Sequence, residues 1–154
     1  VSRGLGDVYK RQVQTIGHDK LNQLRHVKFF KDLEGVHAHM KKHAAILRPK
    51  FEMVEATLEK ELGGLGIGEW TTPKGGYFIS FESLDGCAKK IVAMAKEAGV
   101  VMTGAGATYP YGKDPKDSNI RIAPSFPPIE ELEKAAQVFV VCVKLASVEK
   151  LLAE

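Results

Sequence analysis

The segment "DSNIRIAPSFPPIEELEKA", residues 117–135, predicts a strand, a sharp turn and a helix in succession. Side chains alternate along a strand, so Ile120 and Ile122 share one face of "NIRIA" and Arg121 lies on the other. The isoleucines suit the core, and we expect the guanidinium of Arg121 to point away from it. Such a cation is often only solvated, but the planar fork of arginine suits a carboxylate better than lysine does. Arg121 is therefore a candidate carboxylate-binding residue.

The end of this segment predicts the last helix. Pro128 suits the first turn, and Glu130 and Glu131 suit the positive end of a helix dipole. We expect this helix to run to about Leu152.

A second helix is predicted from Leu33 to Leu62, where apolar residues recur at steps of three and four. Pro49 interrupts the pattern without changing its phase, which indicates a kink and not an end. Thirty residues at about 1.5 Å each give a rod of about 45 Å. A compact domain of this length has a diameter of roughly 38 Å. We therefore expect the helix to connect this domain to another one.

Between these helices the sequence predicts a small sheet and one more helix. Two short strands separated by a turn are predicted within residues 63–86, and "VVMT", residues 100–103, reads as a third strand before "NIRIA". The predicted helix lies between the second strand and "VVMT". It takes Ser83 or Asp85 as its N-cap and ends at Gly99. Residues 104–118 form a long loop. This order predicts an α/β (α+β sandwich) fold, with a small mixed or antiparallel sheet packed against helices.

Composition narrows the functional classes. The 154 residues are 44% hydrophobic and 27% charged, with a net charge of +3, as in one soluble globular domain. The charges form no basic patch for a nucleic acid, and no apolar run reaches the roughly 20 residues of a membrane span. Cys87 and Cys142 fit buried hydrophobes, and we expect a cytoplasmic protein.

Three histidines, His37, His39 and His43, raise the question of a metal site. Residues 39 and 43 are neighbours on a helix, but no Asp, Glu or Cys joins them at ligand spacing. Lys41 and Lys42 would also repel a cation. We therefore expect a solvated basic face and no metal.

The strings "TTPKGGYFISFESLDG" and "AKEAGVVMTGAGATYPYGKDPKDSNIRIAPSFPPIEELEKAAQVFVVCVKLASVEKLL" resemble the C-terminal small domain of fold-type I pyridoxal-phosphate aminotransferases. The likeness is to a bacterial aspartate-aminotransferase-like subgroup and covers residues 13 to 152. It rests on a "P-x-G-G-Y-F" strand start, a "G-V-x-x-x-x-G" step and an "I-R-I" strand before the last helix.

The resemblance also implies a division of the chain. Residues 1–12 have no period and resemble a translated library-adapter read, so we expect a non-native stretch there. Residues 13–32 would be the tail of the large domain, and residues 33–154 the small domain. No methionine precedes Met40, so we expect a piece of a longer protein.

In the family, the arginine of the "I-R-I" strand binds the α-carboxylate of the substrate, which assigns that role to Arg121. Asn22 and Arg25 are weaker candidates near the active site or the partner subunit. The resemblance implies pyridoxal 5'-phosphate as cofactor, aspartate or glutamate and 2-oxoglutarate as substrates, and a homodimer. The Schiff-base lysine and most of the cofactor site would lie in the large domain, so we expect this fragment to be inactive, with no catalytic or cofactor-binding residue of its own.

Two other classes stay open on the sequence alone. Some bacterial transcription regulators join a DNA-binding domain to a ligand-sensing aminotransferase-like domain, and this sequence would look similar in such a protein. A free-standing small-molecule-binding module is the third reading. The upstream coding sequence would separate the transaminase from the transcription regulator, since only the regulator would encode a DNA-binding domain there.

Overall fold

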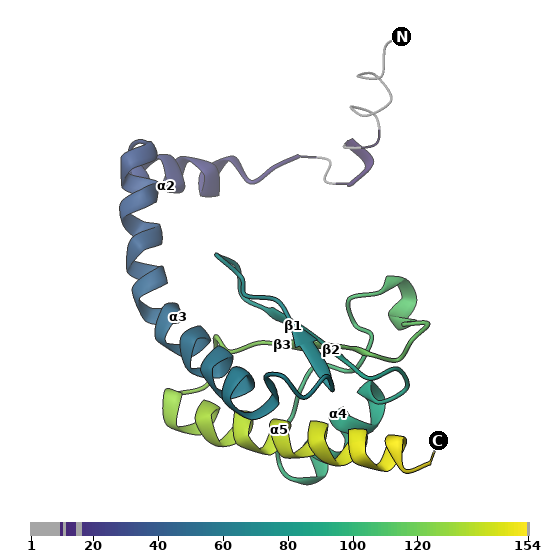
Figure 1. Cartoon of the computed structure of the whole chain (residues 1–154). Coiled ribbons are helices and arrows are strands. Elements are labelled where there is room, and N and C mark those ends of the chain that lie inside the picture. The colour runs from purple at the N-terminus through teal and green to yellow at the C-terminus, as the bar shows by residue number, and fades with distance from the viewer. Residues whose placement is uncertain (1–9, 11, 15–16, 154) are drawn as a thin grey trace. The chain divides into compact units, whose positions relative to one another are not determined.

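The computed structural model describes residues 10, 12–14 and 17–153, and these residues form two compact units that divide after Ala44. Figure 1 labels the helices and strands of the chain. The predicted non-native stretch 1–12 lies almost wholly outside the described residues. No helix in the described part of the chain is long and apolar enough to cross a membrane.

The first unit contains α2 (Lys20–Phe30) and the first turns of α3 (Leu33–Leu62). Asp19 caps α2 by accepting the backbone N–H of Asn22 at 3.0 Å, which satisfies one of the free donors at a helix start. Asp32 does the same for α3 through Gly35, at 2.8 Å. The unit buries none of its described side chains.

Helix α3 confirms the helix predicted over residues 33–62, and it runs through Pro49. Its apolar stripe is buried in the second half only, at Val54, Leu58 and Leu62. The earlier stripe residues Leu33 and Met40 stay more than 60% exposed. Thus the stripe predicted one helix correctly, but the described chain covers only half of it.

The second unit is built on a three-stranded antiparallel sheet of β1 (Gly68–Trp70), β2 (Ile79–Ser83) and β3 (Asn119–Ile122), in that order. In β2 and β3, Ile79 pairs with Ile122 and Phe81 with Ile120, and all four side chains are buried. The alternation expected for "NIRIA" therefore places both isoleucines in the core. This arrangement confirms the predicted α+β fold with a small antiparallel sheet.

Helices α4 (Ala88–Glu97) and α5 (Ile129–Leu151) cover the apolar face of the sheet together with the end of α3 (Figure 1). Phe81 is the centre of this core, since its ring stacks on Trp70 at 6.2 Å and meets Phe139 of α5 edge-on at 5.1 Å. Helix α5 confirms the helix predicted from Pro128 to about Leu152. The layer of helices leaves the other face of the sheet free for polar side chains.

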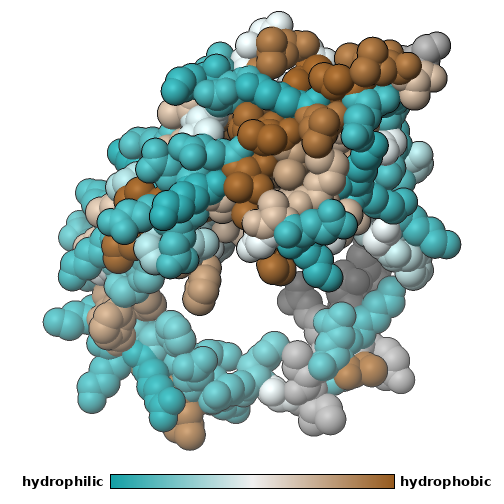
Figure 2. All heavy atoms as spheres, turned by 90° about the horizontal axis from the view of Figure 1, so that it is seen from below, coloured by the Kyte–Doolittle hydropathy of each residue, from teal (hydrophilic) through white to brown (hydrophobic). Residues whose placement is uncertain are grey.

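Helix α5 also carries an apolar stripe on its outer side. Val141, Leu145, Val148 and Leu152 follow one another at helical spacing, and each is between 46% and 82% exposed. Figure 2 views the molecule from the side on which α5 lies and shows hydrophobic side chains gathered there.

The strand predicted at residues 100–103 is wrong. These residues form an irregular segment that pairs with no described strand. The N–H of Val100 donates to Ala95 O at 2.8 Å, and this bond closes the end of α4. Val101 is 82% exposed. A run of β-prone residues forms a strand only beside a partner, and no described strand pairs with this segment.

The predicted N-cap of α4 is also wrong, although Gly99 does end the helix region with a φ of 90°. Ser83 is the last residue of β2, and Asp85 lies in the turn that follows. The cap position is Cys87, whose side chain makes no capping bond. The free N–H groups are satisfied instead by Asp117: its carbonyl accepts from Ala88 at 2.8 Å and its carboxylate from Lys89 at 3.3 Å.

Candidate functional site

The solvent-side face of the sheet carries the polar side chains of β2 and β3. Ser80 pairs with Arg121, and Glu82 pairs with Asn119. Directly paired residues point to the same face of an antiparallel sheet. These four side chains therefore form one polar surface opposite the core, which we call the polar face.

One end of the polar face is a satisfied hydrogen-bond network around Asn119, which is 3% exposed. Its side-chain amide donates to Ser80 Oγ at 2.9 Å and to Glu82 Oε1 at 2.5 Å, and its Oδ1 accepts from the Thr108 hydroxyl at 2.5 Å. The second oxygen of Glu82 accepts from the Ser118 hydroxyl at 2.8 Å. Both oxygens of Glu82 are thus engaged away from Arg121.

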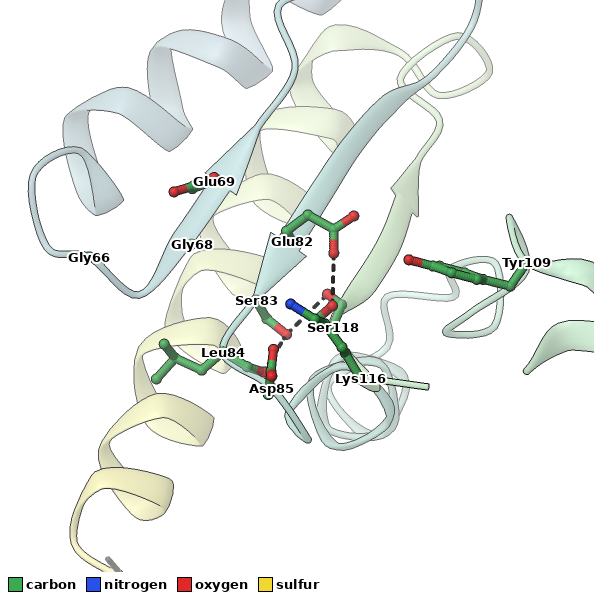
Figure 3. A pocket seen from close by; sticks show the side chains of 10 residues that line it. All are labelled: Gly66, Gly68, Glu69, Glu82, Ser83, Leu84, Asp85, Tyr109, Lys116 and Ser118. Atoms are coloured by element: carbon green, nitrogen blue, oxygen red, sulfur yellow. Dashed lines mark hydrogen bonds between the residues drawn. The ribbon is translucent and has the colours of Figure 1, made fainter. Parts of the chain in front are cut away.

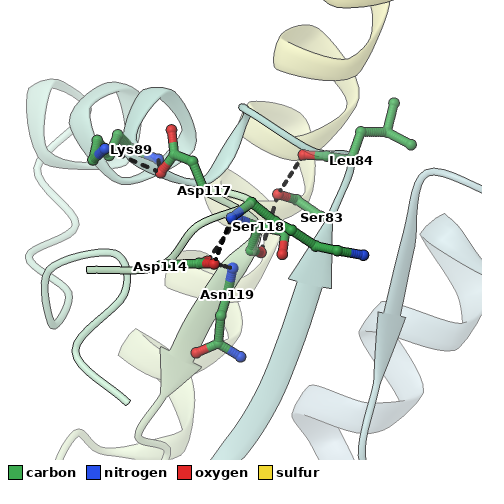
Figure 4. Close-up of polar contacts among 8 residues, drawn as sticks. Ser83, Leu84, Lys89, Asp114, Asp117, Ser118 and Asn119 are labelled. Atoms are coloured by element: carbon green, nitrogen blue, oxygen red, sulfur yellow. Dashed lines mark hydrogen bonds and ion pairs between the residues drawn. The ribbon is translucent and has the colours of Figure 1, made fainter. Parts of the chain in front are cut away.

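Asp114 shapes the loop that leads into β3 (Figure 4). Its carboxylate accepts the backbone N–H groups of Lys116, Ser118 and Asn119 at 2.8 to 3.0 Å. Burial alone would raise the pKa of the Asp114 carboxyl, but these donors, led by Asn119, lower it below its usual value. The ionised Asp114 therefore fixes the backbone just before Asn119 and Arg121.

Arg121 lies at the other end of the polar face and is partly buried. Its Cζ is 4.5 Å from the centroid of the Phe78 ring, a cation–π distance. Its Nε is buried and has no hydrogen-bond partner, and no acidic residue in the described ranges forms an ion pair with the guanidinium. Within these ranges, Nε is the nitrogen of this side chain that is buried without a partner. The two terminal nitrogens are not buried in this way and remain accessible.

This geometry suits the binding of a carboxylate. The two terminal nitrogens of a guanidinium can donate two parallel charge-assisted hydrogen bonds to the two oxygens of a carboxylate. The strand holds the base of the side chain rigidly, because Ile120 and Ile122 anchor it in the core on both sides of Arg121. Such a rigid element positions a bound group better than a loop does.

A separate pocket of about 470 Å³ lies at the end of β1 and β2 (Figure 3). Its lining includes the carboxylates of Glu69, Glu82 and Asp85, the Tyr109 side chain and one cation, Lys116. Arg121 does not line it. Three carboxylates against one lysine do not suit a phosphate dianion, so these residues do not fit the phosphate group of pyridoxal phosphate.

Asn22 and Arg25, the weaker candidates, lie exposed on α2 in the first unit, whereas Arg121 belongs to the second. The Asn22 carbonyl oxygen is 2.8 Å from His26 Nδ1, and its backbone N–H is used in the cap of α2. Their assignment to a site stays a prediction.

The two histidines expected to be neighbours on a helix lie close together on α3. His39 and His43 place their Nε2 atoms 2.9 Å apart, and His39 also packs edge-on against Phe29 and Phe30. His37 is exposed. Within the described ranges, no group of three or more His, Cys, Asp or Glu side chains is placed to hold a metal ion.

Phe78 is the residue of the site that sequence reasoning missed. It belongs to the quoted "P-x-G-G-Y-F" string, but its contact with Arg121 depends on the register of β2 against β3. Residues 78, 80 and 82 alternate onto one face, so the pairing of Ser80 with Arg121 places Phe78 on the same face as Arg121.

Comparisons with known proteins agree with this architecture. Residues 3–154 match the sequence model of the family described as "Aspartate amino-transferase". A curated relative, the aspartate aminotransferase of Corynebacterium glutamicum, is 49% identical over 137 residues, which are 89% of this chain and 32% of that protein. The chain thus spans about a third of the length of this relative.

Solved structures show the same likeness. An aspartate transaminase from Corynebacterium glutamicum superposes with a TM-score of 0.85 at 48% identity, covering 92% of this chain and 33% of the other. The α-aminoadipate aminotransferase LysN from Thermus thermophilus superposes with a TM-score of 0.70 at 20% identity, over 90% of this chain and 34% of that one. The second likeness concerns the fold alone.

Proposed function

This chain belongs to the aspartate amino-transferase family, and from that membership we propose that it is the C-terminal part of a transaminase. The complete protein would transfer the amino group of aspartate or glutamate to a 2-oxo acid such as 2-oxoglutarate. The name of the 49% identical relative supports the choice of substrates. The observation that carries the proposal is the guanidinium of Arg121, which has no acidic partner among the described residues.

In this proposal Arg121 binds the α-carboxylate of the amino acid and of the 2-oxo acid. Both substrates carry that group beside the reacting carbon, so one arginine on a rigid strand would orient both. Glu82 lies on β2 two residues after Ser80, which pairs with Arg121. The carboxylate oxygens of Glu82 accept hydrogen bonds from Ser118 and Asn119. The cation is thereby left for the substrate.

The cofactor of the complete protein would be pyridoxal 5'-phosphate, which supplies the group that carries the amino function between the two substrates. The pocket of Figure 3 does not suit its phosphate, so its site would lie mainly in the part of the protein outside this chain. The 154-residue chain alone would then be inactive. Asn22 and Arg25, exposed on α2, would approach the active site or a second subunit of a cytoplasmic homodimer.

The test is transamination of aspartate and 2-oxoglutarate by the complete reading frame. Replacing Arg121→Lys removes the planar fork but keeps the charge. The loss of a charge-assisted hydrogen bond should raise KM for both substrates about 10- to 100-fold. Arg48→Lys, at an exposed position of α3, is the matched control and should leave KM unchanged.

Two results would contradict the proposal. One is an Arg121→Lys enzyme with the KM values of the Arg48→Lys control. The other is turnover of aspartate by the 154-residue chain when it is supplied with pyridoxal 5'-phosphate, because the chain would then hold a complete cofactor site.

A further inference from the structure

Phe78 occupies an unusual place for a phenyl ring. It directly precedes β2, and it is 47% exposed, whereas the next two hydrophobic residues, Ile79 and Phe81, are completely buried. Burial in the core therefore does not explain its position. Its one ring contact in the described structure is with the guanidinium of Arg121, at 4.5 Å.

The strand register explains how the two side chains meet. Ser80 pairs with Arg121, and Phe78 lies two residues before Ser80, so it is the diagonal neighbour of Arg121 on the polar face. Cζ of the guanidinium lies over this ring, and the negative face of the ring attracts the cation. Nε is buried in the same arrangement, while the terminal nitrogens stay accessible.

We propose that Phe78 is a positioning residue that holds the guanidinium plane of Arg121 so that the two terminal nitrogens receive the substrate carboxylate. The inference rests on the proposed function of Arg121. An arginine side chain has many rotamers, and ordering them on binding weakens affinity. A ring that orders the guanidinium in advance removes part of this cost. The substrate carboxylate should therefore bind about 3- to 10-fold more tightly with the ring than without it.

The first test concerns the contact itself and needs no enzymatic activity. In the ¹⁵N-labelled 154-residue chain, the Arg121 Hε proton should resonate upfield, because Cζ, to which Nε is bonded, lies over the Phe78 ring. Phe78→Leu should move this signal downfield, and Phe78→Tyr should leave it in place. Phe126→Leu is the matched control, since Phe126 is 94% exposed and makes no ring contact within the described ranges. An Hε signal unmoved by Phe78→Leu would overturn the proposal.

The second test concerns the consequence for binding. In the complete protein, Phe78→Leu should raise KM for both aspartate and 2-oxoglutarate about 3- to 10-fold and change kcat little, since the carboxylate is held alike in the ground and transition states. Phe78→Tyr should restore KM, whereas a residue that only maintains the fold would lower the yield of active enzyme without changing KM.

The two proposals fail in different ways. If Arg121→Lys raises KM but Phe78→Leu has the KM of the Phe126→Leu control, Arg121 binds the carboxylate without help from the ring, and the present inference is wrong. If Arg121→Lys itself leaves KM unchanged, the proposed function fails first.

Discussion

Gly68 shows how closely single residues are packed around the core of the sheet. A Cβ added there would lie 2.5 Å from Cζ of Phe81. The Phe81 ring cannot move away easily, because it is fully buried between Trp70 and Phe139. Only glycine fits at this point of β1.

Replacement of Gly68→Ala should therefore lower the free energy of unfolding by about 1 to 3 kcal/mol, the usual cost of overpacking a core. Urea unfolding followed by the fluorescence of the single tryptophan, Trp70, measures the effect. Gly75→Ala is the control, since its Cβ would meet nothing within 4 Å and its φ is not positive. Equal urea midpoints for the two variants would contradict this prediction, because the Phe81 ring would then move aside at no cost in stability.

The residue scale also shows what alternation along a strand can predict. Two isoleucines around one arginine were enough to assign the faces of "NIRIA", because burial of Ile120 and Ile122 determines where the side chain between them goes. The Phe78 ring and the engaged oxygens of Glu82 were not predictable in this way. Both depend on which residues of β2 and β3 are paired, and no local pattern contains that register.

At the scale of elements, the loop before β3 is organised by one ionised side chain. Asp114 accepts three backbone N–H groups, and its pKa is lowered in the folded protein. A lowered pKa means that the folded state favours the carboxylate. The stabilisation is therefore fully present above the ordinary aspartate pKa of about 3.9 and is lost as the pH falls below that value.

Hydrogen exchange of the Ser118 and Asn119 amides should reveal this dependence. Between pH 6 and pH 3, their protection relative to the core amides of β2 should fall as Asp114 becomes protonated. In Asp114→Asn, the side-chain oxygen still accepts hydrogen bonds but does not titrate, so the relative protection should be lower and nearly independent of pH. An identical pH profile in both proteins would show that another group controls the loop.

Helices were predicted better than their ends. The long apolar periods of α3 and α5 are local properties of the sequence, and both helices lie close to the predicted bounds. The start of α4 was wrong because its cap comes from Asp117, 28 residues away from Lys89. The strand predicted at residues 100–103 failed for a similar reason, since β-prone residues alone do not supply a pairing partner.

At the scale of the whole molecule, the described core is confined to the second unit, from Val54 to Ala146. The first unit exposes Leu21, Phe29 and Leu33, each by more than 60%. The overall fold class was predictable because it follows from the order of helices and strands. The outer stripe of α5 was not predicted as exposed, since periodicity places apolar residues on helix faces but does not say which faces find a partner.

In the proposed function, Arg121 receives the carboxylate of the substrate. The most direct measurement is a crystal structure of the complete protein with bound succinate, an unreactive dicarboxylate. We expect one carboxylate of succinate to accept hydrogen bonds from both terminal nitrogens of Arg121 at about 2.7 to 2.9 Å, with the Phe78 ring still against the guanidinium. Succinate bound to other residues, with Arg121 free or paired to Glu82, would contradict the claim.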